Sequence, residues 1–426
     1  MIFIKSKLDK YIKAYVELGW FSGSVLVAKD GKILLCKAYG MANYEHNIPN
    51  TPQTKFRIGS LTKQFTAMAI MLLREKKLLH VNDKICKYIP DYPNGDKITI
   101  HHLLTHTSGI PNFTEFPECK IEQLKSHNTE QLINIFKDKS LEFEPGEKYN
   151  YSNSGYILLT YIIEKISEKN YETFLKENIF EPLGMKDSGC DSFITIIKNR
   201  ASGYGIFNDE LVNAAYIDMS FTSGAGILYS TIEDLYLWDQ ALYKEKLVSQ
   251  KSLDEIFTPF KDSYGYGWII TQSSGHKLVA HAGGINGFSS DISRYPDDHV
   301  CIIVLSNFEH AQSSEIAAGL EAIIFGEKYE IPKKLIVISI NPEVYNQYVG
   351  DYKLKENFFL TITKENNKLF VQATGQSKFQ IYPESETKFF YKYINAQISF
   401  VRDEDNKVTK LILHQGGMDQ EADKVE

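Results

Sequence analysis

The sequence predicts an α/β domain, with an antiparallel sheet flanked by helices and a helical subdomain, followed by a small all-β antiparallel barrel. One observation is that strand-like apolar runs at 23–40 and 277–307 enclose a mostly helical stretch at 60–260. Another is that short alternating apolar runs, separated by turn residues, replace this pattern after Gly326. Such evenly spaced short runs are typical of a small antiparallel barrel or sandwich.

The length of the chain supports this division, because 426 residues exceed one ordinary domain. We expect a first domain at 1–330, a linker at 331–342 and a C-terminal β domain at 343–426. The aromatic residues of the β domain could line a ligand pocket, although filling a barrel core is the commoner use of such side chains. They are Phe358, Phe359, Phe370, Phe389, Phe390 and Tyr391.

The elements of the first domain follow in order along the chain. A short amphipathic helix comes first, and the apolar runs joined by Asp30-Gly31 then predict a β-hairpin. The strands at 277–307 are interrupted at Pro296-Asp297-Asp298, and the segment 310–326 predicts a helix that packs on the sheet. Sheet, helical insert and sheet again imply one body closed by its two ends.

Composition excludes several functional classes. The chain is 43% hydrophobic and 24% charged, which is typical of a soluble globular protein, and its net charge is -7. Without a run of Lys and Arg, we expect no nucleic-acid partner and no anionic membrane surface. The five cysteines form no C-x-x-C pair for zinc or redox work. A small molecule is the expected partner.

The N-terminal residues bear on location. Only four apolar residues precede Lys5, which is too short for the core of a signal peptide, and no apolar stretch is long enough to cross a membrane. We therefore expect a cytoplasmic protein as the sequence stands, and an exported one if the true start lies upstream.

A candidate nucleophile lies at the start of the helical stretch. Ser60 opens an apolar periodic segment and Lys63 follows three residues later, so both side chains lie on one helical face. A serine hydroxyl becomes a useful nucleophile when a neighbour takes its proton, and a buried lysine with a lowered pKa can do so. The alternative is a helix-capping serine followed by a solvated lysine.

Two further polar segments could likewise have either a catalytic or a structural role. Tyr151, Ser152 and Asn153 precede an apolar run, which is also what a helix start looks like. The segment His281-Ala-Gly-Gly ends a strand-like run, where glycines would admit a ligand or a second backbone, or simply form a turn. The histidines at 101, 102 and 106 lack the Glu of a zinc-binding H-E-x-x-H helix, so a structural role is favoured for them.

Taken together and in this order, Ser60-x-x-Lys63, Tyr151-x-Asn153 and His281-x-Gly283 resemble the motifs of the serine β-lactamase and penicillin-binding-protein superfamily. The resemblance is narrower to the branch that holds class C β-lactamases, DD-peptidases, D-aminopeptidases and β-lactamase-like esterases. Other family features are LLTHTSGIP at 103–111 and SGAGILYSTIEDL at 223–235. The C-terminal segment resembles the lipocalin-like β domains of some relatives.

The resemblance implies a role for each motif residue. Ser60 would be the acylated nucleophile, Lys63 its proton partner and Tyr151 a second general base that hands a proton to the leaving group. Asn153 would orient the acyl side of the substrate. His281 would take the place of the strand lysine of Lys-Thr-Gly. No cofactor and no metal are implied.

The resemblance also implies an oxyanion hole and a binding strand. The backbone N–H groups of Ser60 and Gly284 would form the oxyanion hole, and Gly283 would line the substrate-binding strand with them. Ala282 lacks the hydroxyl by which carboxypeptidase members hold a substrate carboxylate. This departure weakens the case for strict DD-carboxypeptidase activity. The motif His-Ala-Gly in place of Lys-Thr-Gly points away from dedicated β-lactamases and toward peptidase or esterase members.

We therefore expect a serine hydrolase that cleaves an amide or ester bond through an acyl-serine intermediate, with D-amino-acid peptides or small esters as substrates and β-lactams as inhibitors. The alternatives are a β-lactamase and a non-catalytic binder of peptidoglycan fragments or another ligand. Lys63 or Tyr151 would need a lowered pKa to act as a base near neutrality. His281 is expected to change charge near pH 6.5, beside the oxyanion site.

Overall fold

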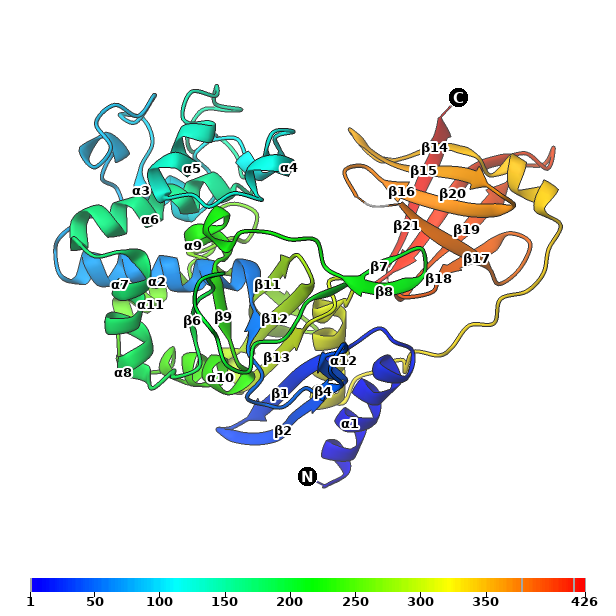
Figure 1. Ribbon diagram of the computed structural model, residues 1–426, viewed down its shortest axis with the longest axis horizontal. Coiled ribbons are helices and arrows are strands. Elements are labelled where there is room, and N and C mark those ends of the chain that lie inside the picture. The colour runs from blue at the N-terminus through cyan, green and yellow to red at the C-terminus, as the bar shows by residue number, and fades with distance from the viewer. Residues whose placement is uncertain (1, 377, 417, 426) are drawn as a thin grey trace. The chain divides into compact units, whose positions relative to one another are not determined.

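The computed structural model describes residues 2–376, 378–416 and 418–425, and the chain divides into two compact units. The first unit consists chiefly of Phe21–Tyr204 and Asn213–Lys328, and the second consists chiefly of Tyr329–Glu426. Figure 1 labels the elements of both units. The predicted boundaries at 330 and 343 stay predictions.

The first unit is built on a six-stranded antiparallel sheet with the order β10-β11-β12-β13-β1-β2 (Figure 1). Its strands are β1 (Gly23–Lys29), β2 (Lys32–Tyr39), β10 (Ile269–Ser273), β11 (His276–Ile285), β12 (Phe288–Tyr295) and β13 (Val300–Ser306). β1 pairs with β13, so the predicted closure of the body by its two ends is confirmed. The predicted hairpin turn is confirmed as well, with positive φ at Asp30 and Gly31.

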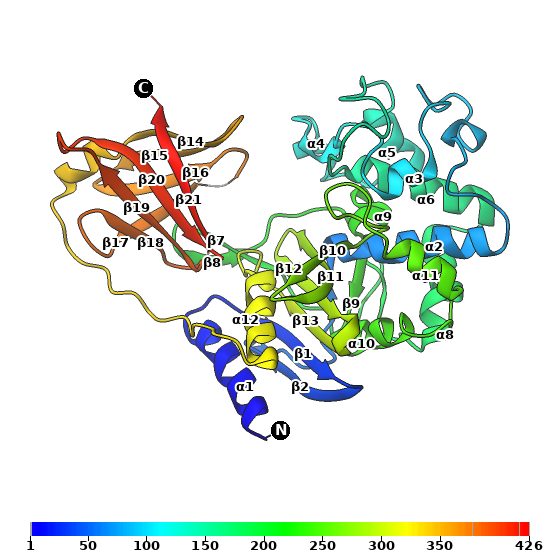
Figure 2. The same cartoon turned by 180° about the vertical axis from the view of Figure 1, so that it is seen from behind.

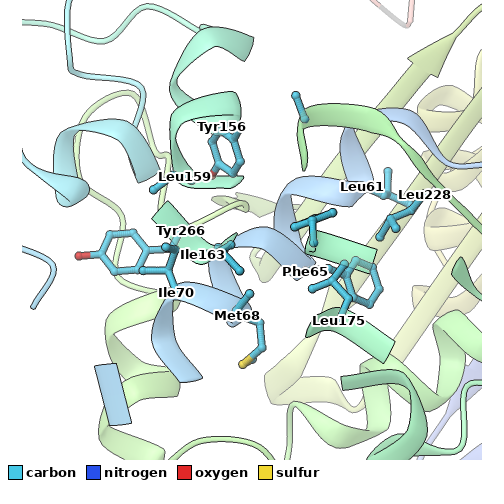
Figure 3. Close-up of a cluster of buried hydrophobic side chains, with 14 of the residues drawn as sticks. Leu61, Phe65, Met68, Ile70, Tyr156, Leu159, Ile163, Leu175, Leu228 and Tyr266 are labelled. Atoms are coloured by element: carbon cyan, nitrogen blue, oxygen red, sulfur yellow. The ribbon is translucent and has the colours of Figure 1, made fainter. Parts of the chain in front are cut away.

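Helices pack on this sheet and form a subdomain beside it. α12 (Ser313–Phe325) contacts β12 and β13, as predicted for this segment, and Figure 2 shows it beside these strands. α10 (Ile232–Ala241) contacts β1 and β13. Figure 3 shows the core of the subdomain, where side chains of α2 (Thr62–Glu75) meet those of α6 (Asn153–Ser167).

The helix α2 is buried along almost its whole length. Phe65, Met68 and Ile70 of α2 lie in one apolar cluster with Tyr156 and Ile163 of α6 (Figure 3). A helix with apolar residues on nearly every side is expected to be central to its domain. This burial fixes the first turn of α2, where Lys63 lies, and the turn η1 (Gly59–Leu61) directly before it, where Ser60 lies.

The strand β11 approaches the turn before α2 closely. A Cβ atom at Gly283 would lie 2.1 Å from the carbonyl oxygen of Ile58, and one at Gly59 would lie 2.9 Å from the carbonyl oxygen of Gly284. Gly59 also has a φ of +50°, which side chains disfavour. Glycines at these two positions therefore allow the strand and the turn to touch.

The second unit contains a closed eight-stranded antiparallel barrel, β14 to β21. The strands are β14 (Gly350–Lys355), β15 (Phe358–Glu365), β16 (Lys368–Ala373), β17 (Lys378–Pro383), β18 (Lys388–Tyr391), β19 (Ala396–Arg402), β20 (Val408–Gln415) and β21 (Met418–Val425). The predicted fold class, an α/β domain followed by an antiparallel barrel, is confirmed.

The remaining elements are short or peripheral, and no helix in the described ranges is long and apolar enough to cross a membrane. The remaining helices are α1 (Ile2–Glu17), α3 (Ile100–Leu104), α4 (Cys119–Glu122), α5 (Thr129–Phe136), α7 (Tyr171–Leu175), α8 (Glu181–Leu183), α9 (Ser223–Gly226), α11 (Gln250–Ile256), η1 (Gly59–Leu61), η2 (Ile85–Lys87), η3 (Phe113–Glu115), η4 (Lys176–Phe180), η5 (Met219–Phe221), η6 (Pro296–Asp298) and η7 (Pro342–Gln347). The remaining strands are β3 (Met41–Asn43), β4 (Ile48–Pro49), β5 (Phe56–Arg57), β6 (Gly189–Cys190), β7 (Tyr204–Phe207), β8 (Glu210–Asn213) and β9 (Leu228–Ser230).

Candidate active site

Three of the predicted side chains meet at one oxygen atom. Ser60 lies in the single turn η1 that leads into α2. Its Oγ lies 3.0 Å from Nζ of Lys63 and 2.8 Å from the hydroxyl oxygen of Tyr151. The structure thus brings together residues 91 positions apart in the sequence around one candidate nucleophile.

Lys63 is fully buried and surrounded by neutral oxygens. Besides Ser60 Oγ, its Nζ donates to Oδ1 of Asn153 at 2.8 Å and to the carbonyl oxygen of Ala225 at 2.9 Å. No carboxylate in the described part of the chain bonds to it. Burial without a compensating negative charge lowers the pKa of Lys63 well below its ordinary value. A neutral amine is the form that can accept a proton from Ser60.

Burial keeps the proton on Tyr151, whereas it favours loss of the proton from Lys63. Burial raises the pKa of the Tyr151 phenol, and the hydrogen bond to Ser60 only partly offsets this effect. The phenol therefore remains protonated near neutrality and acts as a donor toward Ser60 Oγ. The lowered pKa that a base requires is found at Lys63 and not at Tyr151.

Asn153 links the lysine to a loop that the sequence analysis did not single out. Its Nδ2 donates to Oδ1 of Asn112 and to Oγ1 of Thr114, both at 3.2 Å, so Oδ1 faces Lys63. Its backbone N–H also donates to Asn112 Oδ1, whereas the side chain of Ser152 makes no capping bond to α6. Asn112 directly follows the family feature at 103–111, which is the signal that could have identified it.

His281 is buried and both of its ring nitrogens have partners inside the protein. Nδ1 lies 2.6 Å from the carbonyl oxygen of Ala282, so Nδ1 carries the proton, and Nε2 accepts from the Tyr264 hydroxyl at 2.9 Å. Burial, together with the nearby Lys63, lowers the pKa of His281 to about 4. The prediction that this histidine changes charge near pH 6.5 is therefore wrong, because the imidazole is neutral throughout the neutral range.

The two predicted glycines lie where the strand faces the nucleophile. Gly283 abuts the Ile58 carbonyl, and the Ser290 hydroxyl donates to that same carbonyl at 2.8 Å, which holds β11 and β12 against the turn. Gly284 lines the same cavity as Ser60. The backbone of Gly284 thus borders the space in front of the candidate nucleophile.

That cavity has a volume of about 270 Å³, and both apolar and polar side chains line it. Phe113, Ile217, Phe221 and Ile285 contribute its apolar walls. Among its described lining residues Lys120 is the only charged one, and none is Asp or Glu. The cavity therefore offers apolar walls to a substrate group but no described carboxylate to pair with a cation.

The three histidines near residue 100 have structural partners. Nδ1 of His101 lies 2.8 Å from the Tyr266 hydroxyl, and His102 forms a capping box with Thr99 at the start of α3. His106 is buried, its ring lies 4.3 Å from that of Tyr151 between centroids, and its Nδ1 accepts from the Ser152 N–H. His106 therefore fixes the position of Tyr151. No cluster that could hold a metal occurs among the described residues.

Comparison with known proteins gives matches over both units. Residues 8–324 match the family described as Beta-lactamase, and residues 336–425 match one described as a domain of unknown function, DUF3471. Penicillin-binding protein 4* of Bacillus subtilis is 33% identical to this chain over 98% of both proteins.

Two solved structures extend the comparison. The octameric penicillin-binding protein homologue from Pyrococcus abyssi has a TM-score of 0.70 at 28% identity, covering 98% of this chain and 99% of that one. The D-amino acid amidase from Ochrobactrum anthropi SV3 has a TM-score of 0.63 at 25% identity, covering 74% of this chain and 96% of that one.

The lowered pKa of His281 predicts an acid-sensitive contribution to stability. Its pKa is about 6.5 in an unfolded chain and about 4 in the folded protein, so between these values only the unfolded chain binds the proton. The contribution is complete above pH 6.5 and is lost as the pH falls to 4. Urea unfolding at pH 7 and pH 4 should show that wild type loses about 3 kcal/mol more stability than His281→Gln over this interval.

The variant His46→Gln, at an exposed histidine, controls for the loss of an imidazole as such. Equal losses of stability in wild type and His281→Gln would show that His281 is protonated in the folded protein well above pH 4.

Proposed function

Because this chain belongs to the beta-lactamase family of serine hydrolases, we propose that it cleaves an amide or ester bond through an acyl intermediate on Ser60. The observation that carries this assignment is the meeting of Lys63 Nζ and the Tyr151 hydroxyl at Ser60 Oγ. The names of the relatives, a penicillin-binding protein and a D-amino acid amidase, support an acyl-transfer reaction on an amide.

Acylation begins with proton transfer from Ser60 to the neutral amine of Lys63. Oγ attacks the carbonyl carbon of the substrate, and the electron pair of the C=O bond moves to its oxygen. Ser60 and Gly284 both line the cavity, and their backbone N–H groups would stabilise that oxyanion. The oxygens of Asn153 and Ala225 then stabilise the ammonium form of Lys63.

Expulsion of the leaving group requires a proton, and Tyr151 is the protonated group beside the reacting atom. As the scissile C–N or C–O bond breaks, the phenol gives its proton to the leaving nitrogen or oxygen, and the resulting phenolate lies close to the Lys63 ammonium. The phenolate regains a proton from Lys63, which restores both groups. Water later attacks the ester carbonyl, and its proton returns to Ser60 through the same pair.

The cavity also favours one class of acyl group. Its apolar walls suit an apolar side chain, and Lys120 repels a cation, while no described acidic residue lines the cavity to pair with a free α-ammonium group. His281 is neutral and its nitrogens are occupied, so it provides no cation for a substrate carboxylate. We infer that the substrate is an amide or ester whose acyl part is apolar and carries no free amine.

The acyl-enzyme can be detected by intact mass spectrometry. Incubation with a fluorescent penicillin or a fluorophosphonate should give one covalent adduct per chain, absent in Ser60→Ala. Acylation should be slower by about 10²- to 10⁴-fold in Lys63→Met, since the general base is lost. The exposed lysine at the end of α2 provides the matched control Lys76→Met, which should react at the wild-type rate. Absence of an adduct with both reagents would instead favour a non-catalytic binding protein.

The substrate class predicts a preference between two otherwise identical anilides. N-acetyl-D-phenylalanine p-nitroanilide should show a kcat/KM at least about threefold higher than D-phenylalanine p-nitroanilide, because only the latter places an ammonium group near Lys120. Lys120→Glu should reverse this preference while leaving Ser60 acylation intact. Faster cleavage of the free-amine anilide by wild type would refute the substrate class without affecting the acyl-serine proposal.

A further inference from the structure

The two ends of the barrel interior differ in how they are filled. At one end, the rings of Tyr348 and Phe400 stack with centroids 4.1 Å apart, and Phe389 lies 5.6 Å from each of them. The hydroxyls of Tyr348 and Tyr352 both donate to backbone carbonyls, at 2.7 Å and 2.8 Å. This end is a packed aromatic core in which these phenols have partners.

The other end encloses a cavity of about 370 Å³. All eight strands of the barrel contribute to its lining. The large apolar side chains are Leu354, Phe358, Leu360, Val371, Phe379 and Leu413, and the charged and amide side chains are Lys355, Glu356, Gln376, Gln415 and Gln420. Of the aromatic residues considered from the sequence, Phe358 and Tyr391 line the cavity and Phe389 belongs to the core. An eight-stranded barrel can either be filled by side chains or hold one small ligand. This barrel is filled by side chains at one end and has room for a small ligand at the other.

The empty volume is not forced by the backbone. Ala373 and Ala396 both line the cavity, and larger apolar side chains at these positions would occupy it. An unfilled apolar volume forgoes the contacts that stabilise a protein interior. Ligand pockets are usually preformed. In this barrel the packed aromatic core supports the strands, and the unfilled end leaves room for a ligand.

Tyr391 contributes a phenol to this cavity. Tyr391 lines the cavity, and its hydroxyl makes no hydrogen bond within the described residues, unlike the hydroxyls of Tyr348 and Tyr352. Its ring lies 6.3 Å from that of Phe379 between centroids. Burial raises the pKa of the Tyr391 phenol, so the hydroxyl stays protonated and can both donate and accept a hydrogen bond.

We propose that the barrel is a binding site for a small apolar molecule that carries one hydrogen-bonding group, with its apolar part in the 370 Å³ cavity and its polar group at the Tyr391 hydroxyl. Phenols that are largely removed from water usually have a hydrogen-bond partner, and the apolar walls of the cavity favour the apolar part of a ligand over water. The site lies wholly within the second unit and is independent of the chemistry at Ser60.

The probe for this site is N-phenyl-1-naphthylamine, an apolar fluorophore with a single N–H group. Titration into the full-length protein should give a saturable, blue-shifted fluorescence with one probe bound per chain. Ala373→Phe should weaken binding at least about tenfold by filling the cavity. Gln397→Phe adds the same ring to the outer face of β19 and should leave the affinity unchanged.

A pair of probes tests the role of Tyr391. Tyr391→Phe keeps the ring and should weaken binding of the amine probe roughly 2- to 10-fold, the usual value of one hydrogen bond. Binding of 1-phenylnaphthalene, which has no hydrogen-bonding group, should be unchanged in this variant. Equal effects on both probes would refute the assignment of the polar contact.

Folding and catalysis provide the controls. Thermal unfolding of each variant checks that the protein is folded. The rate of Ser60 acylation checks the first unit and should equal that of wild type. Ala396→Phe fills the same cavity from the neighbouring wall and replaces Ala373→Phe should that variant fail to fold. Absence of saturable probe binding to wild type, or wild-type affinity in a folded cavity-filling variant, would overturn the proposal.

Discussion

The first unit is organised around an amine that is buried with neutral partners only. Lys63 Nζ has hydrogen-bond partners in three parts of the chain: Ser60 in the turn before α2, Asn153 at the first residue of α6, and Ala225 in α9. Burying a charged ammonium without a counter-ion is costly, so the protein favours the neutral amine there. The packing of α2 in the core, which serves no chemistry directly, is what keeps water and carboxylates away from this group.

The same burial sets the charge of the groups around the lysine. Tyr151 is kept as a neutral phenol and His106 and His281 as neutral imidazoles, because each is removed from water next to other neutral side chains. The surroundings of Ser60 therefore hold a neutral base and a neutral acid side by side. Such a pair can exchange a proton through the serine without creating a net charge in the core, which suits acyl transfer on a neutral amide or ester.

Much of this arrangement could be predicted from the sequence because its signals are local. The i, i+3 spacing places Ser60 and Lys63 on one face of α2, and Asp30-Gly31 predicts the hairpin of β1 and β2. Contacts between distant segments carry no such signal: the Asn112 amide that orients Asn153 and the Tyr264 hydroxyl on His281 follow from tertiary packing. The charge state of His281 could not be predicted for the same reason. Alternation along the strands predicts which barrel residues face inward but not whether they fill the interior. The cytoplasmic location stays a prediction.

The central claim is that burial lowers the pKa of Lys63 well below its ordinary value, which allows the amine to act as the base for Ser60. The most direct measurement is an NMR titration of the lysine side-chain ¹³Cε and ¹⁵Nζ signals in the Ser60→Ala protein, with the Lys63 signal assigned by its loss in Ser60→Ala/Lys63→Met. Lys63 should titrate well below the value of about 10.4 that is typical of exposed lysines, and the exposed lysines of the same sample provide the internal reference. A Lys63 signal that titrates together with the exposed lysines would contradict the account.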